Sequence, residues 1–212
     1  MLHSYDELYV AKAQTALAQM LRYAVEDMHL ELNEFWDRFL ISGVADLFGK
    51  GDYRFLVGKS GVETAWEVMW RVTGEWPKEQ PSFSLGKSPT YWTGWILAWY
   101  QWYSGQSFRR ISEFLSPEQA REMYNPYHEM DPMQFADEMN RRLSLFYKDT
   151  RLHARRVAAG YSQSALAKAS GVSLRQIQQF EQRVRDINKT QALNLYRLGR
   201  TLGCSAEELL EL

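Results

Sequence analysis

The sequence predicts an all-α protein with two domains, an N-terminal Trp-rich helical domain and a smaller C-terminal helical domain. Apolar residues recur at helical spacing along most of the 212 residues, and strand-like alternation is scarce. All eight Trp precede residue 103. Residues 1–149 carry 15 Lys and Arg against 21 Asp and Glu, whereas residues 150–212 carry 10 against 5. We therefore expect domains at 1–147 and 150–212 with different partners, the basic one suited to an anionic surface.

The composition excludes several classes of protein. With 45% hydrophobic residues the chain can bury a core, so it is not mostly disordered. Cys204 is the only cysteine, which rules out an internal disulfide and fits a reducing compartment. No apolar run approaches the ~20 residues that span a bilayer, and the N-terminus lacks the features of a signal peptide. We expect a cytoplasmic protein that does not contact membranes.

The first third of the chain is expected to form three helices. Apolar spacing predicts the first over residues 5–28 and the second over residues 31–48. Ser60 and Glu63 form a capping box that opens the third, which ends near Gly74. A short extended piece is expected around 52–57.

The middle of the N-terminal domain is dominated by tryptophan. Prolines and glycines between residues 77 and 89 predict a loop. The helix expected next, over 90–105, carries one stripe of four indoles, at Trp92, Trp95, Trp99 and Trp102. Aromatic residues at helical spacing usually face inward, so we interpret the stripe as core. Tryptophans that the core cannot bury would form an interaction patch on the surface.

Two more helices complete the N-terminal domain, which then holds about six. Ser116 and Asp131 each precede a proline, a pattern that starts helices, here at about 117–124 and 132–147. Nucleophile, phosphate-loop and dinucleotide motifs are missing, and the acidic residues near His29 and His128 lack metal-ligand spacing. We therefore expect no enzymatic activity, no cofactor and no metal.

Residues 151–181 have the pattern of three helices, the second and third of which are joined by a tight turn. Gly160 ends a first helix, and Gly171 makes the turn between the second and third. We expect Ser162 and Ser173 to cap the second and third helices. On the second helix Ala165, Leu166 and Ala169 should face inward, and on the third helix Ile177 and Phe180 should do so. Val172, in the turn, is expected to pack into the core. Gln and Arg remain outside on the third helix. Because Gln pairs with adenine and Arg with guanine in the major groove, this face is typical of a DNA-reading helix.

This segment resembles the helix-turn-helix of the phage lambda repressor/Cro (XRE-type) family. The resemblance depends on the ordered set R-x-x-x-G-x-S-Q-x-x-L-A-x-x-S-G-V-S-x-x-x-I-x-x-x-E, which runs from Arg156 to Glu181, and on the leucines that follow up to Leu210. It covers residues 151–212. The family fold implies five helices, at about 150–159, 162–170, 173–182, 189–202 and 205–211.

The resemblance also implies roles for ten side chains. The base-reading positions are Ser173, Arg175, Gln176 and Gln179. The phosphate-binding positions are Ser162, Gln163, Arg183 and Arg185, with Gln163 also bracing the third helix. Arg156 and Glu181 match a structural ion pair. The chain departs from the family where a glycine often follows the third helix, since it reads Glu-Gln-Arg-Val-Arg there.

The implied function is that of a sequence-specific DNA-binding transcription regulator, a repressor that reads the major groove of double-stranded operator DNA with helix 173–182. The N-terminal domain then dimerises, senses a small molecule or binds a protein partner. The layout also resembles an antitoxin-like autorepressor, whose partner is a cognate toxin. A homodimer would read an inverted repeat with half-sites ~34 Å apart. The alternatives are a ligand-responsive repressor with a Trp-lined pocket and, less favoured, an enzyme domain targeted to DNA.

Overall fold

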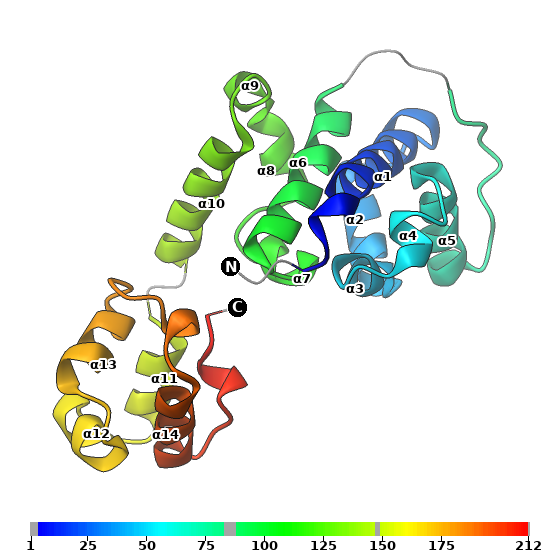
Figure 1. The fold of residues 1–212 in the computed structure, drawn as a ribbon. Coiled ribbons are helices and arrows are strands. Elements are labelled where there is room, and N and C mark those ends of the chain that lie inside the picture. Colours follow the sequence, from blue (N-terminus) through cyan, green and yellow to red (C-terminus); the bar gives the residue numbers. More distant parts are fainter. Residues whose placement is uncertain (1–3, 83–87, 147–148, 212) are drawn as a thin grey trace. The chain divides into compact units, whose positions relative to one another are not determined.

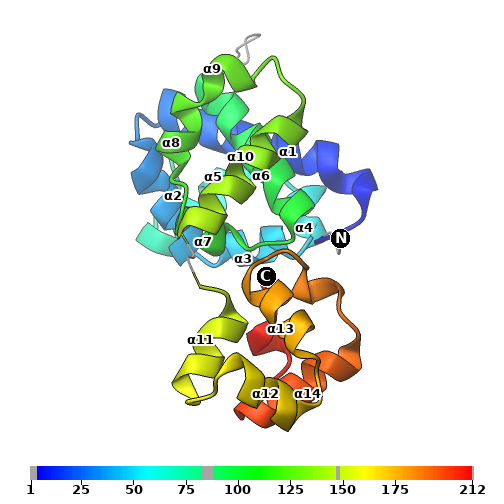
Figure 2. The same cartoon turned by 90° about the vertical axis from the view of Figure 1, so that its left-hand side faces the viewer.

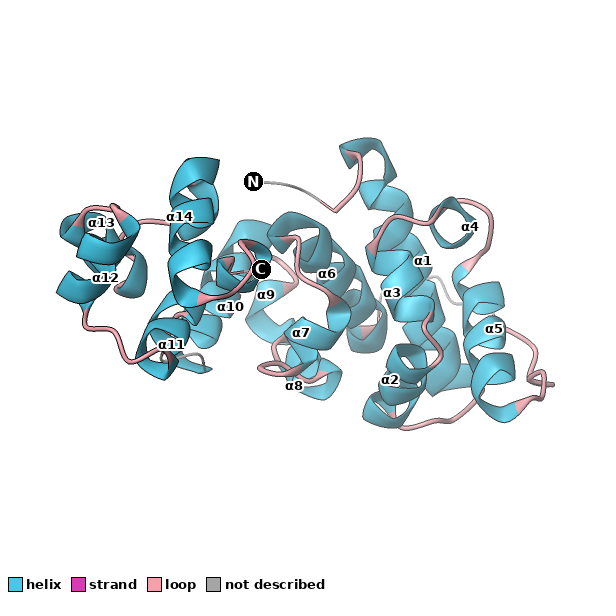
Figure 3. Cartoon of the chain, turned by 90° about the horizontal axis from the view of Figure 1, so that it is seen from below, coloured by secondary structure: helices cyan, strands magenta, loops and turns pink. Residues whose placement is uncertain are grey.

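The computed structural model describes residues 4–82, 88–146 and 149–211, and every regular element in these ranges is helical (Figures 1 and 3). The predicted all-α fold class is therefore confirmed. The chain divides into two compact units, Met1–Arg142 and Leu143–Leu212. The division lies within one helix, α10 (Pro132–Phe146), and each unit is described separately below.

The first unit is built around two long helices that lie side by side, α1 (Val10–Arg22) and α6 (Pro89–Ser104) (Figure 1). A Cβ on Gly94 of α6 would lie 2.6 Å from the Ala18 Cα and from the Leu17 carbonyl oxygen of α1, so this glycine permits the close approach. The other elements are η1 (Glu7–Tyr9), the π-helical turn η2 (Tyr23–Asp27), α2 (Leu32–Ile41), α3 (Val44–Gly49), α4 (Tyr53–Leu56), α5 (Gly61–Thr73), α7 (Phe108–Ser112), α8 (Pro117–Glu122) and α9 (Tyr124–Tyr127). Helix α5 packs on α1 as well.

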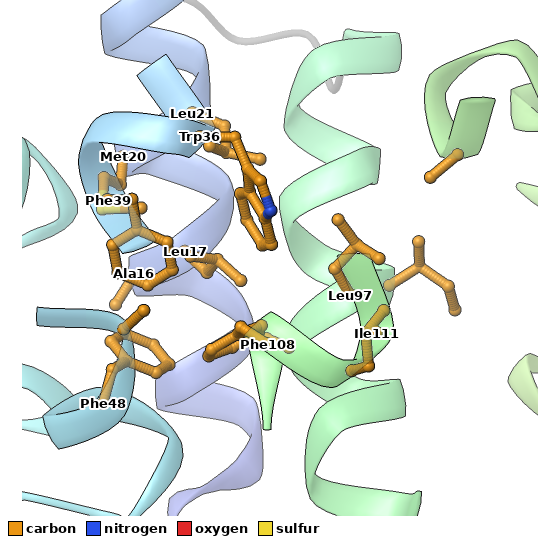
Figure 4. Packing of buried hydrophobic residues seen from close by; sticks show 14 of the residues in the cluster. Ala16, Leu17, Met20, Leu21, Trp36, Phe39, Phe48, Leu97, Phe108 and Ile111 are labelled. Carbon is orange, nitrogen blue, oxygen red and sulfur yellow. The ribbon is translucent and has the colours of Figure 1, made fainter. Parts of the chain in front are cut away.

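An aromatic cluster fills the core between these helices (Figure 4). The ring of Phe108 lies 5.5 Å from those of Trp36 and Phe39 and 5.9 Å from that of Phe48, centroid to centroid, in edge-on geometry. Such pairs are favourable because the positive edge of one ring meets the negative face of the next. The Trp36 indole N–H is satisfied, since it donates to the Ser112 hydroxyl at 2.7 Å.

Three of the four tryptophans of the α6 stripe, Trp92, Trp95 and Trp99, belong to this core or pack against it. Trp92 and Trp102 are buried, and Trp95 and Trp99 are half-buried against the core. The inward interpretation of the stripe therefore holds. Indoles in excess of the core are found elsewhere, at Trp70 and Trp76.

Several expectations for the first unit were wrong in detail. The expected helix 31–48 is two helices, because the chain turns at Gly43, where φ is 75°. Residues 53–56 are the short helix α4 rather than extended chain, since the Asp52 carboxylate accepts from the Arg54 N–H at 3.0 Å and caps it. Helices α7 and α9 were not expected.

The second unit contains four α-helices, α11 (Arg151–Ala158), α12 (Gln163–Ser170), α13 (Leu174–Glu181) and α14 (Ala192–Leu202), and two 3-10 turns, η3 (Ile187–Lys189) and η4 (Glu207–Leu209), within the described residues (Figure 2). Its own core is formed by Leu152, Leu166, Val172, Ile177, Phe180, Ile187, Leu198 and Leu209. The fifth helix, expected over residues 205–211, is only the 3-10 turn η4. The fourth begins at Ala192, after η3, rather than at 189.

Candidate nucleic-acid interface

The turn between α12 and α13 is fixed by local capping. The Ser162 hydroxyl accepts from the Ala165 N–H at 3.1 Å and opens α12. Gly171 ends that helix with φ of 70°, a conformation that favours glycine. Val172 then enters the core, and the Ser173 hydroxyl accepts from the Gln176 N–H at 3.3 Å to open α13. The short sequence from Ser162 to Gln176 therefore determines how the two helices meet.

Helix α12 is less buried than expected. Leu166 is fully buried, whereas Ala165 and Ala169 are exposed, so the expectation that both alanines face inward was wrong. Ala167 is the alanine that packs on the core. The outer face of α12 is thus formed of small residues together with the exposed Lys168.

Helix α13 has one apolar and one polar face. Ile177 and Phe180 are buried in the core of the second unit. The opposite face carries the base-reading candidates: Ser173 and Arg175 are exposed, and Gln176 and Gln179 are half-buried. The Ser173 hydroxyl lies 3.2 Å from the Gln176 Oε1 and donates to it, which orients that side-chain amide. Leu174, 39% exposed, adds an apolar side chain at the same end of the helix.

A buried ion pair ties α13 to α11 and α12. The Arg156 guanidinium donates to both carboxylate oxygens of Glu181, at 2.7 and 2.9 Å, and also to the Tyr161 carbonyl at 2.7 Å. The Gln163 side chain donates to the same carboxylate at 2.8 Å. Gln163, placed among the phosphate ligands by the resemblance, therefore braces α13 through Glu181.

The environment of Glu181 favours its charged form. Burial alone would raise the pKa of this carboxyl, but the hydrogen bonds from Arg156 and Gln163 together outweigh burial and hold the pKa below its usual value. The carboxylate therefore stays ionised to lower pH than an ordinary glutamate does.

The two arginines after α13 have different surroundings. Arg183 adopts φ of 56°, the left-handed conformation, where the family often has glycine. Its guanidinium donates to the Asp149 carbonyl at 3.3 Å and lies 4.0 Å from the Glu211 carboxylate. Arg185 is exposed, and its guanidinium lies 5.9 Å from the centre of the Phe180 ring. Of the two, Arg185 has the more accessible charge for a phosphate.

Sequence reasoning missed an apolar surface on α14. Leu193 and Tyr196 lie one turn apart and are 53% and 59% exposed. Neither residue lies on the helix face that contains the buried Leu198. Apolar residues outside the buried face are the sequence signal that could have identified this surface.

Comparison with known families covers the second unit. Residues 152–209 match the family model described as Helix-turn-helix. These residues form a helix-turn-helix domain of the lambda repressor/Cro (XRE) type. This domain supports a role in DNA binding and transcription regulation. No curated protein and no solved structure matches the chain.

Two kinds of feature are missing from the ranges 4–82, 88–146 and 149–211. No three His, Cys, Asp or Glu side chains gather there as a metal site. None of the helices described there has the length and apolar character needed to cross a membrane.

Proposed function

We propose that the chain is a sequence-specific repressor that places α13 in the major groove of operator DNA. The observation that carries the proposal is the polar side of α13, where Arg175 is exposed and Gln176 and Gln179 are half-buried, whereas Ile177 and Phe180 are buried in the core. The arginine and glutamine side chains have the donors and acceptors that read guanine and adenine edges. The proposal assigns no catalysis to either unit.

Flanking groups support the same orientation on DNA. Ser162 and Gln163 stand at the N-terminus of α12, whose macrodipole favours a phosphate. Arg185 follows α13 and is exposed. Phosphate contacts provide affinity without sequence information, whereas contacts to base edges select the operator. Binding should therefore weaken steeply as salt rises.

The roles of these side chains can be tested by selecting bound duplexes from a random pool. The affinity for variants of the selected operator is then measured. Gln179→Ala should relax base preference at one position and cost about 1–3 kcal/mol on the preferred site. Arg185→Ala should weaken binding to all sequences alike and flatten the salt slope. Arg54→Ala, which removes an exposed arginine from the first unit, is the matched control and should change neither. Identical effects of Gln179→Ala and Arg185→Ala across operator variants would refute these roles.

We infer that the first unit binds a protein partner, as in an antitoxin-like autorepressor that neutralises a toxin. The supporting observation is a stacked indole pair on its surface: the Trp70 and Trp76 rings lie 5.7 Å apart, and these residues are 48% and 57% exposed. Exposed tryptophans of this kind are frequent energetic centres of protein interfaces.

Co-expression with the products of neighbouring genes tests the second proposal. A partner should co-purify with the intact chain and be lost from a Trp70→Ser, Trp76→Ser double variant that still binds the selected operator. A Trp99→Phe variant, altered at a half-buried indole of α6, is the control and should retain the partner. A partner that stays bound to the double variant would exclude this surface.

A further inference from the structure

A small aromatic pocket lies in the first unit, away from the exposed indole pair. Its volume is about 130 Å³, and its walls come from the N-terminal half of α6, from α9 and from the segment that leads into α10. The lining residues are Tyr91, Trp92, Trp95, Ile96, Tyr127, His128, Met130 and Pro132. Four of these eight residues are Trp or Tyr.

The rings of the pocket are held in place by neighbours behind them. The Trp92 ring lies edge-on to Tyr124 at 5.7 Å and to Phe135 at 6.0 Å, and the Tyr127 ring lies edge-on to Phe135 at 6.1 Å. Phe135 is fully buried. The aromatic walls are therefore preorganised and do not need to reorder when a ligand enters.

The pocket lining carries neither a lysine nor an arginine. The carboxylates of Glu129 and Asp131 alternate along the chain with three of the eight lining residues. The His128 Nδ1 donates to the Tyr124 carbonyl at 2.9 Å, and its Nε2 lies 3.6 Å from the Glu129 carboxylate. The electron-rich face of an aromatic ring attracts positive charge.

We propose that this pocket binds a compact organic cation, a methylated ammonium group carried by a free small molecule. Aromatic rings recognise such groups through their negative faces. The volume is below the roughly 300 Å³ at which drug-sized sites begin and close to the roughly 150 Å³ that holds one benzene-sized group. In a ligand-responsive repressor with a Trp-lined pocket, this cation would be the ligand. Binding of the cation itself does not require DNA.

Titration of the full chain with choline tests the proposal, with calorimetry as the readout. The neutral isostere 3,3-dimethylbutan-1-ol has the same shape without the charge and should bind about tenfold or more weakly. Trp95→Leu and Tyr127→Leu should each weaken choline binding by about three- to thirtyfold, as expected for one lost cation–π contact. Trp76→Leu, outside the pocket, is the matched control and should bind choline normally. Circular dichroism verifies that each variant is folded.

The outcomes separate the possibilities. Equal binding of choline and its isostere, no saturable binding of choline, or normal binding by both folded pocket variants would overturn the proposal. Tighter binding of a trimethyl-lysine peptide than of choline would overturn the assignment to a free small molecule. Choline binding that leaves operator affinity unchanged supports the cation site and excludes its coupling to DNA. If the chain binds choline but no operator, only the proposed DNA-binding function is refuted. The two proposals can therefore fail independently of each other.

Discussion

Removing the carboxylate of Glu181 should destabilise the second unit more than any single change on its DNA-reading face. The Arg156 and Glu181 side chains are 10% and 4% exposed, and the carboxylate accepts two hydrogen bonds from Arg156 and one from Gln163. Glu181→Leu leaves the guanidinium buried without its partner. Breaking one side of a buried pair costs about 3–5 kcal/mol.

The structure indicates the lower end of that range. Arg156 keeps its hydrogen bond to the Tyr161 carbonyl, so part of the guanidinium stays satisfied. We therefore expect a loss of about 3 kcal/mol in the free energy of unfolding. A unit of roughly 70 residues has a total stability of about 4–10 kcal/mol, so the variant is expected to be marginally folded. Replacing both partners, Arg156→Met with Glu181→Leu, should restore most of the loss, because apolar residues need no partner.

Urea unfolding of the full chain measures the effect with an internal control. All eight tryptophans lie in the first unit, so tryptophan fluorescence follows that unit alone. Circular dichroism follows the helices of both. Glu181→Leu should move part of the dichroism transition to lower urea and leave the fluorescence transition unchanged. A shift below about 1 kcal/mol would show that the pair acts as a surface ion pair and would refute the argument.

Three other predictions follow from the same structure. The stability of the second unit should fall as pH drops below about 4.5 and through the lowered pKa of Glu181. The Arg156→Met, Glu181→Leu double variant should lose less stability over the same pH range. Unfolding followed by circular dichroism at several pH values measures the difference. Arg183→Gly should be about 1 kcal/mol more stable than Arg183→Ala in urea unfolding, because only glycine adopts this left-handed conformation freely; equal stabilities would argue against the φ of 56°. Gly94→Ala should destabilise the first unit by about 1–3 kcal/mol, since its Cβ would meet the Ala18 backbone; an unshifted fluorescence transition would contradict the close contact of α1 and α6.

Much of the second unit was predictable because its signals are local. Ser162 and Ser173 cap helices within three residues, and Gly171 makes the turn by its own conformational freedom. The left-handed conformation of Arg183 was not predictable, because arginine is not a residue that favours it. Its contacts with Asp149 and Glu211 join residues distant in sequence.

The first unit was harder to predict because its organisation depends on long-range packing. Periodicity identified the long helix α6 and its inward tryptophans. It could not show that Trp92 and Trp95 share a pocket with Tyr127, since about thirty residues separate them and the intervening helices α7 and α8 return the chain to α6. Nor did it separate core indoles from the exposed Trp70, because Trp70 lies in a helix with apolar neighbours such as Met69 and Val72.

The opposite charges of the two parts of the chain restrict what each can bind. Residues 1–149 carry 21 acidic against 15 basic side chains and are repelled by phosphates, so DNA contacts are expected from the second unit alone. The number of phosphates neutralised, as deduced from the salt slope, should then match basic groups of the second unit such as Arg185. A protein recognised through the first unit should correspondingly be neutral or basic, with the exposed indoles as anchors. An acidic partner bound tightly at moderate salt would contradict this electrostatic division, even if Trp70 and Trp76 proved to be its contact residues.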